Sequence, residues 1–236
     1  MKTIALIPAR YGASRFPGKL MEMLGNKTVI RHTYENTVAT LLFDDVIVVT
    51  DSSIIFNEIV ENGGHDIMRR QECESGSDRI AEAATEIEVD IIINVQGDEP
   101  FIKKEPLQAL IKVFENDERH LVEVASLMHE LNDKDLVSDP NTVKVVVDNN
   151  MNALLFSRSI IPFQRNAAVD AVYYKHIGIY AFRKQALMSF TQWQMSPLEA
   201  IEKLEQLRYL ENGVNIRMVL TTESPVSIDT REDLER

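Results

Sequence analysis

The feature that most constrains the fold of this 236-residue chain is an alternation between short apolar runs and stretches with helical spacing. The apolar runs are rich in β-branched residues and end in polar turns, as strands covered on both faces do. They predict strands at residues 3–7, 46–50, 91–95 and 143–147. Residues 52–60, which are followed by Gly63, and residues 77–87 have the spacing of helices with one apolar side. The alternation predicts βαβ units and a largely parallel sheet.

The second half of the chain is less regular. Strands are predicted at residues 153–157 and 174–182, and the latter is long enough to belong to an antiparallel or mixed part of the sheet. The segment Ser196-Pro197-Leu198-Glu199 predicts a helix start, because Ser can cap the helix, Pro suits its first turn and Glu can close a capping box. This helix is expected to run to about Leu210 and to stop near Gly213.

Composition narrows the classes of protein and partner. The net charge of −12 repels nucleic acid and anionic membranes, so we expect neither as a partner. The single cysteine, Cys73, excludes an internal disulfide and fits a reducing compartment. No segment approaches the roughly 18 apolar residues of a membrane span, so we expect a cytoplasmic protein. No repeat or linker divides the chain, and one domain over residues 1–236 is the simplest expectation.

The loop after the first strand, residues 10–19, lies where ligands bind in open α/β sheets, beyond the carboxyl end of a strand. Residues 1–31 contain six Lys or Arg and one acid, a local charge of +5 in an acidic chain. Arg10 and Arg15 offer planar forks to phosphate oxygens and Lys19 offers a point charge. Glycines in the loop expose backbone N–H groups to a ligand. The loop therefore predicts a site for the phosphates of a nucleoside triphosphate, with a solvated basic surface loop as the alternative.

Two familiar phosphate motifs do not fit this loop. A P-loop has four residues between its glycines and Ser or Thr after its lysine, but five residues separate Gly12 from Gly18 and Leu20 follows Lys19. The dinucleotide fingerprint G-x-G-x-x-G is absent from the sequence.

Two aspartates are candidates for holding a metal ion. Asp98 follows the strand predicted at 91–95, and Asp229 follows the apolar segment 226–228, which we expect to be a strand end running into a helix. Mg²⁺ is typically held by one or two carboxylates, with substrate phosphates and water completing its octahedron. An Asx turn at Asp98 and a helix N-cap at Asp229 remain the alternatives.

With these residues in view, the chain resembles the 3-deoxy-manno-octulosonate cytidylyltransferases, or CMP-Kdo synthetases. The resemblance spans the whole chain in the family's order. It is carried by the blocks 7–11 (IPARY), 16–19 (FPGK), 75–79 (SGSDR), 94–100 (NVQGDEP), 156–158 (FSR), 161–163 (IPF), 176–180 (HIGIY), 196–199 (SPLE), 204–208 (LEQLR) and 229–234 (DTREDL).

The resemblance implies an α/β, Rossmann-like three-layer nucleotidyltransferase fold with a mixed, mostly parallel central sheet. It implies transfer of CMP from CTP to Kdo, an acidic eight-carbon sugar, with Mg²⁺ as cofactor and a product that serves lipopolysaccharide biosynthesis. It also implies a homodimer, with a dimerisation and sugar-binding excursion around residues 130–190.

Site residues follow from the matching blocks. Arg10, Lys19 and Asp98 are expected to be catalytic, and Asp98 and Asp229 to hold Mg²⁺. The residues expected to bind CTP are Pro8, Ala9, Arg10, Ser14, Arg15, Lys19, Ser75, Arg79 and Gln96. The residues expected to bind the sugar acid are Gln96, Arg158, His176, Tyr180, Glu205 and Gln206.

One departure from the family pattern concerns Cys73, which stands between Glu72 and Glu74 where relatives often carry histidine. The added acids suggest an alternative substrate, 8-amino-Kdo, in which an amino group replaces the terminal hydroxyl. Another acidic sugar and a non-catalytic nucleotide-binding relative are the further alternatives.

Overall fold

The computed structural model describes residues 1–12, 16–69, 76–223, 226–228 and 230–235. The chain forms two compact units, of which the first contains Met1–Gln108, Ala181–Thr191 and Pro225–Arg236. The second contains Ala109–Tyr180 and Gln192–Ser224. Helix α4 (Lys104–Glu115) and strand β10 (Tyr173–Arg183) each span a boundary between the units.

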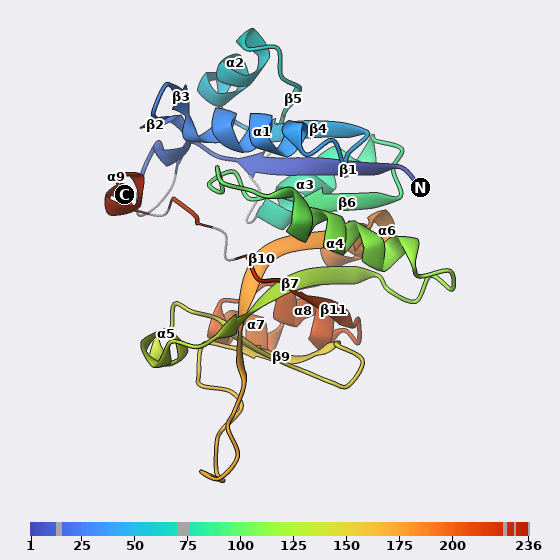
Figure 1. The fold of residues 1–236 in the computed structure, drawn as a ribbon. Coiled ribbons are helices and arrows are strands. Elements are labelled where there is room, and N and C mark those ends of the chain that lie inside the picture. The colour runs from blue at the N-terminus through green and yellow to red at the C-terminus, as the bar shows by residue number, and fades with distance from the viewer. Residues whose placement is uncertain (13–15, 70–75, 224–225, 229, 236) are drawn as a thin grey trace. The chain divides into compact units, whose positions relative to one another are not determined.

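The first unit is built on four parallel strands in the order β6-β1-β4-β5, three of which lie side by side in Figure 1. Residues 4–7 of β1 and 91–93 of β6 are fully buried, because helices cover both faces of the sheet. The bounds are β1 (Thr3–Ala9), β4 (Asp45–Thr50), β5 (Asp66–Met68) and β6 (Ile91–Asn94). A small antiparallel pair, β2 (Met23–Leu24) and β3 (Lys27–Thr28), follows the first loop.

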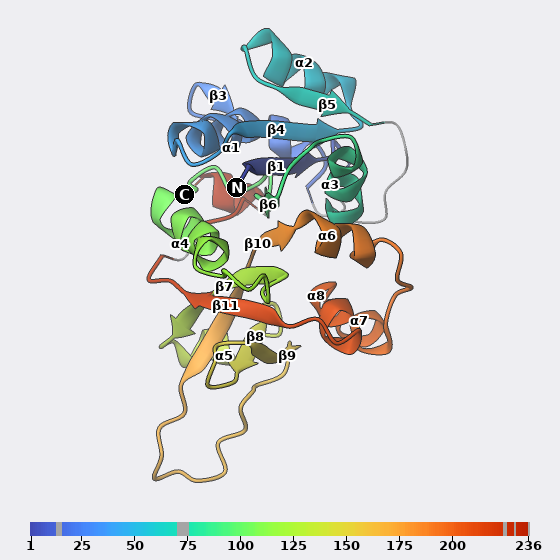
Figure 2. The same cartoon turned by 90° about the vertical axis from the view of Figure 1, so that its right-hand side faces the viewer.

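The helices of the first unit form layers on the two faces of these strands. Figure 2 shows α1 on one side of β1 and β4, with α3 and α6 on the other. The helices described in this unit are α1 (Val29–Ala39), α2 (Ser53–Glu61), α3 (Gly76–Thr85), α6 (Lys184–Phe190), α9 (Arg231–Glu235) and the 3-10 helix Lys19–Met21.

The second unit holds a mixed set of strands. Strand β11 pairs in parallel with β7, whereas β8 pairs antiparallel with both β10 and β9. The bounds in this unit are β7 (Val124–Leu131), α5 (Lys134–Ser138), β8 (Lys144–Val147), β9 (Ala153–Ser157), α7 (Pro197–Glu202), α8 (Gln206–Glu211) and β11 (Ile216–Leu220). A long loop between β9 and β10 extends away from the strands of this unit (Figures 1 and 2).

The predicted strands are confirmed within one or two residues by β1, β4, β6, β8, β9 and β10, and the two earlier helices by α2 and α3. Two predictions are wrong. The single helix expected to run from 196 to about 210 is two helices, because Lys203 adopts a left-handed conformation (φ 55°) that ends α7. Residues 226–228 are not a strand; the N–H of Ile228 instead donates to the carbonyl oxygen of Asp98 (2.9 Å).

The expected capping box at the start of α7 is present, with Ser196 and Glu199 bonded reciprocally. None of the helices in the described ranges is long and apolar enough to cross a membrane.

Candidate functional site

The loop after β1 is closed at its base by a backbone hydrogen bond. The N–H of Gly18 donates to the carbonyl oxygen of Tyr11 at 2.9 Å, and Gly18 has a left-handed φ of 74°. A side chain there would be strained, and its Cβ would also contact the Tyr11 ring at 3.4 Å. Lys19 then begins a 3-10 helix immediately after this closure. The two ends of the loop carry an exposed Arg10 and a half-buried Lys19, which places two cations beyond the carboxyl end of β1.

The turn after β6 lies against the end of β1 at a distance that requires glycine. A Cβ on Gly97 would come within 3.0 Å of the carbonyl oxygen of Pro8 and 3.2 Å of the Ile30 side chain. The ring of Pro8 also lies 3.5 Å from the Cβ that Gly76, at the start of α3, would carry. Pro8, Gln96 and Asp98 are therefore brought to one edge of the first unit, where parallel strands end.

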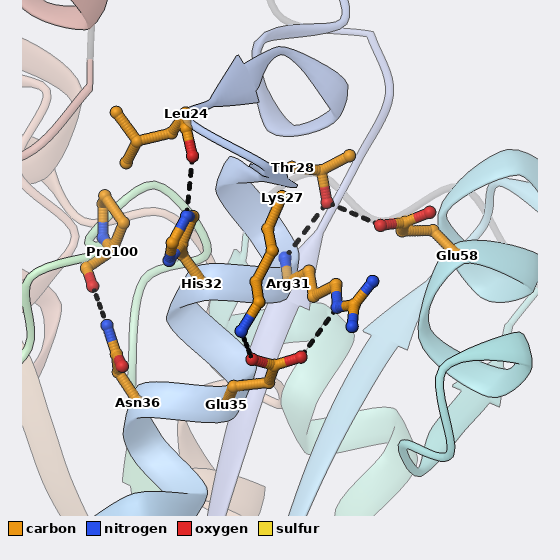
Figure 3. Close-up of polar contacts among 9 residues, drawn as sticks. All are labelled: Leu24, Lys27, Thr28, Arg31, His32, Glu35, Asn36, Glu58 and Pro100. Atoms are coloured by element: carbon orange, nitrogen blue, oxygen red, sulfur yellow. Dashed lines mark hydrogen bonds and ion pairs between the residues drawn. The ribbon is translucent and has the colours of Figure 1, made fainter.

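Helix α1 holds both sides of this turn. The hydroxyl of Thr33 donates to the carbonyl oxygen of Gly97 (2.9 Å), and the side-chain amide of Asn36 donates to that of Pro100 (2.6 Å; Figure 3). Thr33 is completely buried, so the Gly97 carbonyl is satisfied out of reach of solvent. The backbone on either side of Asp98 is thereby fixed to a helix.

The start of α1 is itself tied down by side chains (Figure 3). Thr28 caps the helix by accepting from the N–H of Arg31 (3.3 Å), and its hydroxyl donates to Glu58 (3.0 Å). Burial acts to raise the pKa of the Glu35 carboxyl, but hydrogen bonds from Lys27 and Arg31 bring that pKa below its ordinary value. Glu35 is therefore ionised at neutral pH and forms ion pairs with Lys27 of β3 and Arg31 of α1.

Asp98 forms an ion pair with Lys19, so a predicted metal ligand and a predicted phosphate ligand are in direct contact. The pairing uses Oδ2 of the half-buried carboxylate, and no hydrogen bond within the described residues is made to Oδ1. The carbonyl oxygen of Asp98 accepts from Ile228, the residue before Asp229. Asp229 itself lies outside the described residues.

The donor set at this position fits magnesium. Within the described ranges, no group of three or more His, Cys, Asp or Glu side chains could hold a metal ion by itself. Mg²⁺ needs no such group, because one or two carboxylates suffice when substrate phosphates and water supply the other ligands. Asp98 is such a carboxylate, with the ammonium group of Lys19 beside it.

Of the other residues predicted to bind CTP, some are buried in the first unit and some lie outside the described residues. Ala9 is buried at the last position of β1. Arg79 is buried on α3 and pairs through Nη2 with Asp51 (2.7 Å), while its Nη1 has no hydrogen-bond partner among the described residues. Ser14, Arg15 and Ser75 lie outside the described residues, and the structure says nothing of them.

Arg158 follows β9 in the second unit and is anchored by backbone carbonyls. Its Nε donates to the carbonyl oxygen of Glu202 (2.8 Å) and its Nη1 to that of Pro140 (3.0 Å). Lys144 is fully buried below it and donates through Nζ to the carbonyl oxygens of Thr142 and Arg158, each at 2.6 Å. Burial lowers the pKa of Lys144. These bonds fix the direction of the guanidinium and leave its other N–H groups for an anion.

His176 lies on β10 between two aromatic rings, with Phe156 at 5.0 Å and Tyr180 at 5.4 Å between ring centroids. Desolvation, helped by the charge of Lys175, lowers the pKa of the imidazole to about 3. His176 is therefore neutral at physiological pH. Desolvation, followed by the charge of Glu205, raises the pKa of Tyr180 well above 10, so its hydroxyl stays protonated.

The imidazole nitrogens of His176 have side-chain neighbours in the same unit. The Ser126 hydroxyl lies 3.1 Å from Nε2, and the side-chain amide of Gln206, at the start of α8, lies 3.5 Å from Nδ1. The structure thus brings together His176, Tyr180 and Gln206, three of the five predicted sugar-binding residues in this unit. Glu205 directly precedes Gln206 in the chain.

Sequence reasoning missed three polar residues in these two sets of contacts: Thr33, Asn36 and Ser126. Thr33 and Asn36 have no distinctive pattern around them. Ser126 interrupts the apolar run 124–128, and a buried hydroxyl in a strand needs a hydrogen-bond partner, so this residue gave a usable signal.

Comparisons with known proteins agree with this geometry. The family model described as cytidylyltransferase matches residues 4–216. A 3-deoxy-manno-octulosonate cytidylyltransferase of Flavobacterium johnsoniae is 59% identical over all 236 residues, which cover 97% of its length. The enzyme of the same name from Christiangramia forsetii is 55% identical over 235 residues, which cover the whole chain and 95% of that protein.

Solved structures point the same way. A CMP:2-keto-3-deoxy-manno-octonic acid synthetase complexed with CTP is 40% identical to this chain, with a TM-score of 0.94 over 100% of this chain and 96% of the other. A 4-diphosphocytidyl-2C-methyl-D-erythritol synthase from Anaerococcus prevotii, 16% identical with a TM-score of 0.64 over 99% and 95% of the two chains, shares the fold. The mixed, mostly parallel sheet flanked by helices is thus a nucleotidyltransferase fold. From its family model and full-length relatives, this chain belongs to the cytidylyltransferase family and, within it, to the 3-deoxy-manno-octulosonate cytidylyltransferases.

Proposed function

We propose that this chain transfers CMP from CTP to the anomeric hydroxyl of 3-deoxy-D-manno-octulosonate (Kdo), giving CMP-Kdo and pyrophosphate. The observation that carries the proposal is the 59% identity over the full chain to a relative whose name specifies both cytidylyl transfer and the sugar. A similar structure that contains CTP supports the nucleotide.

The reaction needs no nucleophile from the protein. The sugar hydroxyl attacks the α-phosphorus of CTP in line and pyrophosphate leaves, so the protein must position the reactants and neutralise charge. We assign CTP to the end of β1 in the first unit, where Arg10 and Lys19 stabilise the β- and γ-phosphates and the departing pyrophosphate. The backbone at Pro8 and Ala9 and the side chain of Gln96 adjoin this position.

We further propose that Asp98, with Asp229, holds Mg²⁺ together with phosphate oxygens. The half-buried carboxylate beside Lys19 supports this, as does the bond from Ile228 to the Asp98 carbonyl oxygen. When bound, the ion supplies positive charge to the phosphate oxygens and lowers the pKa of a coordinated hydroxyl.

The sugar acid is assigned chiefly to the second unit. The anchored guanidinium of Arg158 can bind the sugar carboxylate through its remaining N–H groups, in the geometry that favours arginine for this role. Neutral groups for the sugar hydroxyls are His176, Tyr180 and Gln206, and Glu205 adds an acceptor.

We also propose a cytoplasmic homodimer whose product serves lipopolysaccharide biosynthesis. The loop between β9 and β10 exposes Ile160, Phe163, Val169 and Val172, of which Phe163 is 83% exposed. Apolar side chains gathered on a protruding segment are typical of a surface that another subunit covers. The lone cysteine of the chain fits a reducing compartment. Sedimentation velocity of Phe163→Asp tests the dimer: we expect a monomer, and an unchanged sedimentation coefficient would contradict this assignment.

The function is tested by a pyrophosphate-release assay. Each of the four nucleoside triphosphates is combined with Kdo, 8-amino-Kdo, a nine-carbon sialic acid or no sugar, with Mg²⁺ present. We expect release only with CTP, and the highest kcat/KM with Kdo. Preference for 8-amino-Kdo would favour the alternative raised by Cys73 and its acidic neighbours, which lie outside the described residues. No release with any pair would contradict the enzymatic function.

A further inference from the structure

Ser126 connects the backbone of β10 to the imidazole of His176. Its Oγ lies 2.9 Å from the carbonyl oxygen of Ile179, 3.1 Å from that of Ile177 and 3.1 Å from Nε2 of His176. Ser126 is completely buried on β7, so water does not satisfy its hydroxyl. All these groups belong to the second unit.

The neighbours of this hydroxyl decide where its hydrogen points. A serine hydroxyl has one hydrogen, and a carbonyl oxygen can only accept. If the hydrogen pointed at His176, the lone pairs of Oγ would face two carbonyl oxygens at about hydrogen-bond distance, which is repulsive. The hydrogen therefore goes to a carbonyl of β10, and Oγ accepts a hydrogen bond from Nε2–H of His176.

Because the imidazole of His176 is neutral, the hydrogen on Nε2 also determines the state of Nδ1. At neutral pH His176 carries a single N–H, because desolvation keeps it uncharged. With the hydrogen on Nε2, Nδ1 is an acceptor. The ring cannot easily rotate away, since Phe156 meets it edge-on at 72° and Tyr180 lies on the same strand.

The side-chain amide of Gln206 lies next to Nδ1 of His176. Its nearest approach to Nδ1 is 3.5 Å, and an acceptor nitrogen attracts the NH₂ end of an amide and repels the oxygen end. The amide oxygen then faces away from His176. Gln206 is buried, and among the described residues no protein group donates to this oxygen.

We propose that Ser126 is a positioning residue that fixes the Nε2–H tautomer of His176 and, through it, the orientation of the Gln206 amide. The amide oxygen is thereby presented to accept a hydrogen bond from a hydroxyl of the acceptor sugar. The choice of ligand rests on the proposed function, whereas the tautomer rests on Ser126 and His176 alone. A Ser126 that bonded only within the sheet would predict no effect on either.

The first test reads the tautomer directly. Two-dimensional ¹H–¹⁵N spectra of the imidazole in the full-length protein at pH 7 distinguish Nε2–H from Nδ1–H. We expect the Nε2–H pattern for His176, a shift toward a tautomer mixture in Ser126→Ala, and no change in Ser138→Ala. Ser138 is the matched control, because its hydroxyl also donates to a backbone carbonyl (Lys134, 3.1 Å) but has no imidazole neighbour. An Nδ1–H pattern in the unaltered protein would overturn the proposal, whether or not Ser126→Ala folds.

The second test is kinetic. Losing one oriented hydrogen bond to the sugar predicts that Ser126→Ala raises KM for Kdo about tenfold while KM for CTP stays unchanged. Gln206→Glu replaces the amide NH₂ with a second acceptor oxygen, which Nδ1 of His176 repels. We expect this variant to raise KM for Kdo by at least as much. Unchanged KM values in Ser126→Ala would refute the positioning role even with the expected tautomer. Absence of turnover in the unaltered protein, with the Nε2–H tautomer present, would instead refute the proposed function and the sugar ligand while leaving the tautomer assignment intact.

Discussion

Asp66 on β5 carries a buried carboxylate without a compensating partner, and we predict that Asp66→Asn stabilises the protein above neutral pH. Its two carboxylate oxygens have no hydrogen-bond partner among the described residues, and the residue is 9% exposed. Desolvation raises the pKa of Asp66 from 3.8 to about 7. In the sheet it pairs with Val48 of β4, which is fully buried.

The magnitude follows from the shift in pKa. Because the folded pKa is raised, the native state binds the proton more tightly than the unfolded state, and the contribution of Asp66 to stability is fully present below pH 4. That contribution falls as the pH rises from about 4 to 7 and is constant above. A shift of about three units at about 1.4 kcal/mol per unit gives a loss of about 4 kcal/mol at pH 8. Asparagine has nearly the same shape and does not ionise, so it removes this loss.

The assay is urea denaturation followed by circular dichroism at pH 5, 6, 7 and 8. We expect the free energy of unfolding of Asp66→Asn, relative to that of the unaltered protein, to increase by about 2 kcal/mol between pH 5 and 7 and then to level off. Glu88→Gln, at an exposed position in the same unit, is the charge-matched control and should show no such growth. A difference between Asp66→Asn and the unaltered protein that is constant across this range would refute the reasoning.

Two further predictions concern the region proposed to bind CTP, and a third concerns the stability of the second unit. Asp98→Asn should keep the circular dichroism spectrum and abolish pyrophosphate release; near-normal release at saturating Mg²⁺ would contradict its role. Gly97→Ala should lower kcat/KM for CTP at least tenfold, because its Cβ would press on the Pro8 carbonyl oxygen at 3.0 Å; wild-type kinetics would show that the backbone yields there without effect. Arg208 donates two hydrogen bonds, at 2.5 and 2.7 Å, to the buried carboxylate of Glu199. Arg208→Met should lower the free energy of unfolding by about 3–5 kcal/mol, because it leaves that buried charge without its cation. Urea denaturation at pH 7 measures this loss, and a change below 1 kcal/mol would count against it.

The regular parts of the fold could be predicted because local chemistry determines them. Buried parallel strands require continuous apolar runs, and Ser196 with Glu199 forms the capping box that their spacing indicated. The end of α7 could not be predicted, because a lysine in a left-handed conformation has no sequence signature.

The candidate site was predictable where residue type alone carries the chemistry. The Arg10–Lys19 loop and Asp98 stood out by charge and by position after a strand. Their mutual contact did not, because an ion pair across 79 positions depends on tertiary structure. The same holds for Thr33 and Asn36, whose role lies entirely in which carbonyl each one reaches.

In the free protein, Lys19 and Asp98 bind each other through their ion pair, although we propose that one binds phosphate and the other a metal ion. If Lys19 binds phosphate and Asp98 binds the metal, neither can engage fully until the pair separates. A nucleotide that binds without metal must separate Lys19 from Asp98, whose carboxylate then faces the negative phosphates. A metal ion that binds without nucleotide must compete with Lys19 for the carboxylate of Asp98. The metal–nucleotide complex satisfies both partners at once. With the roles proposed for Lys19 and Asp98, thermodynamic linkage predicts that the metal and the nucleotide each raise the affinity of the chain for the other by the same factor, so that CTP and its counter-ion bind best together.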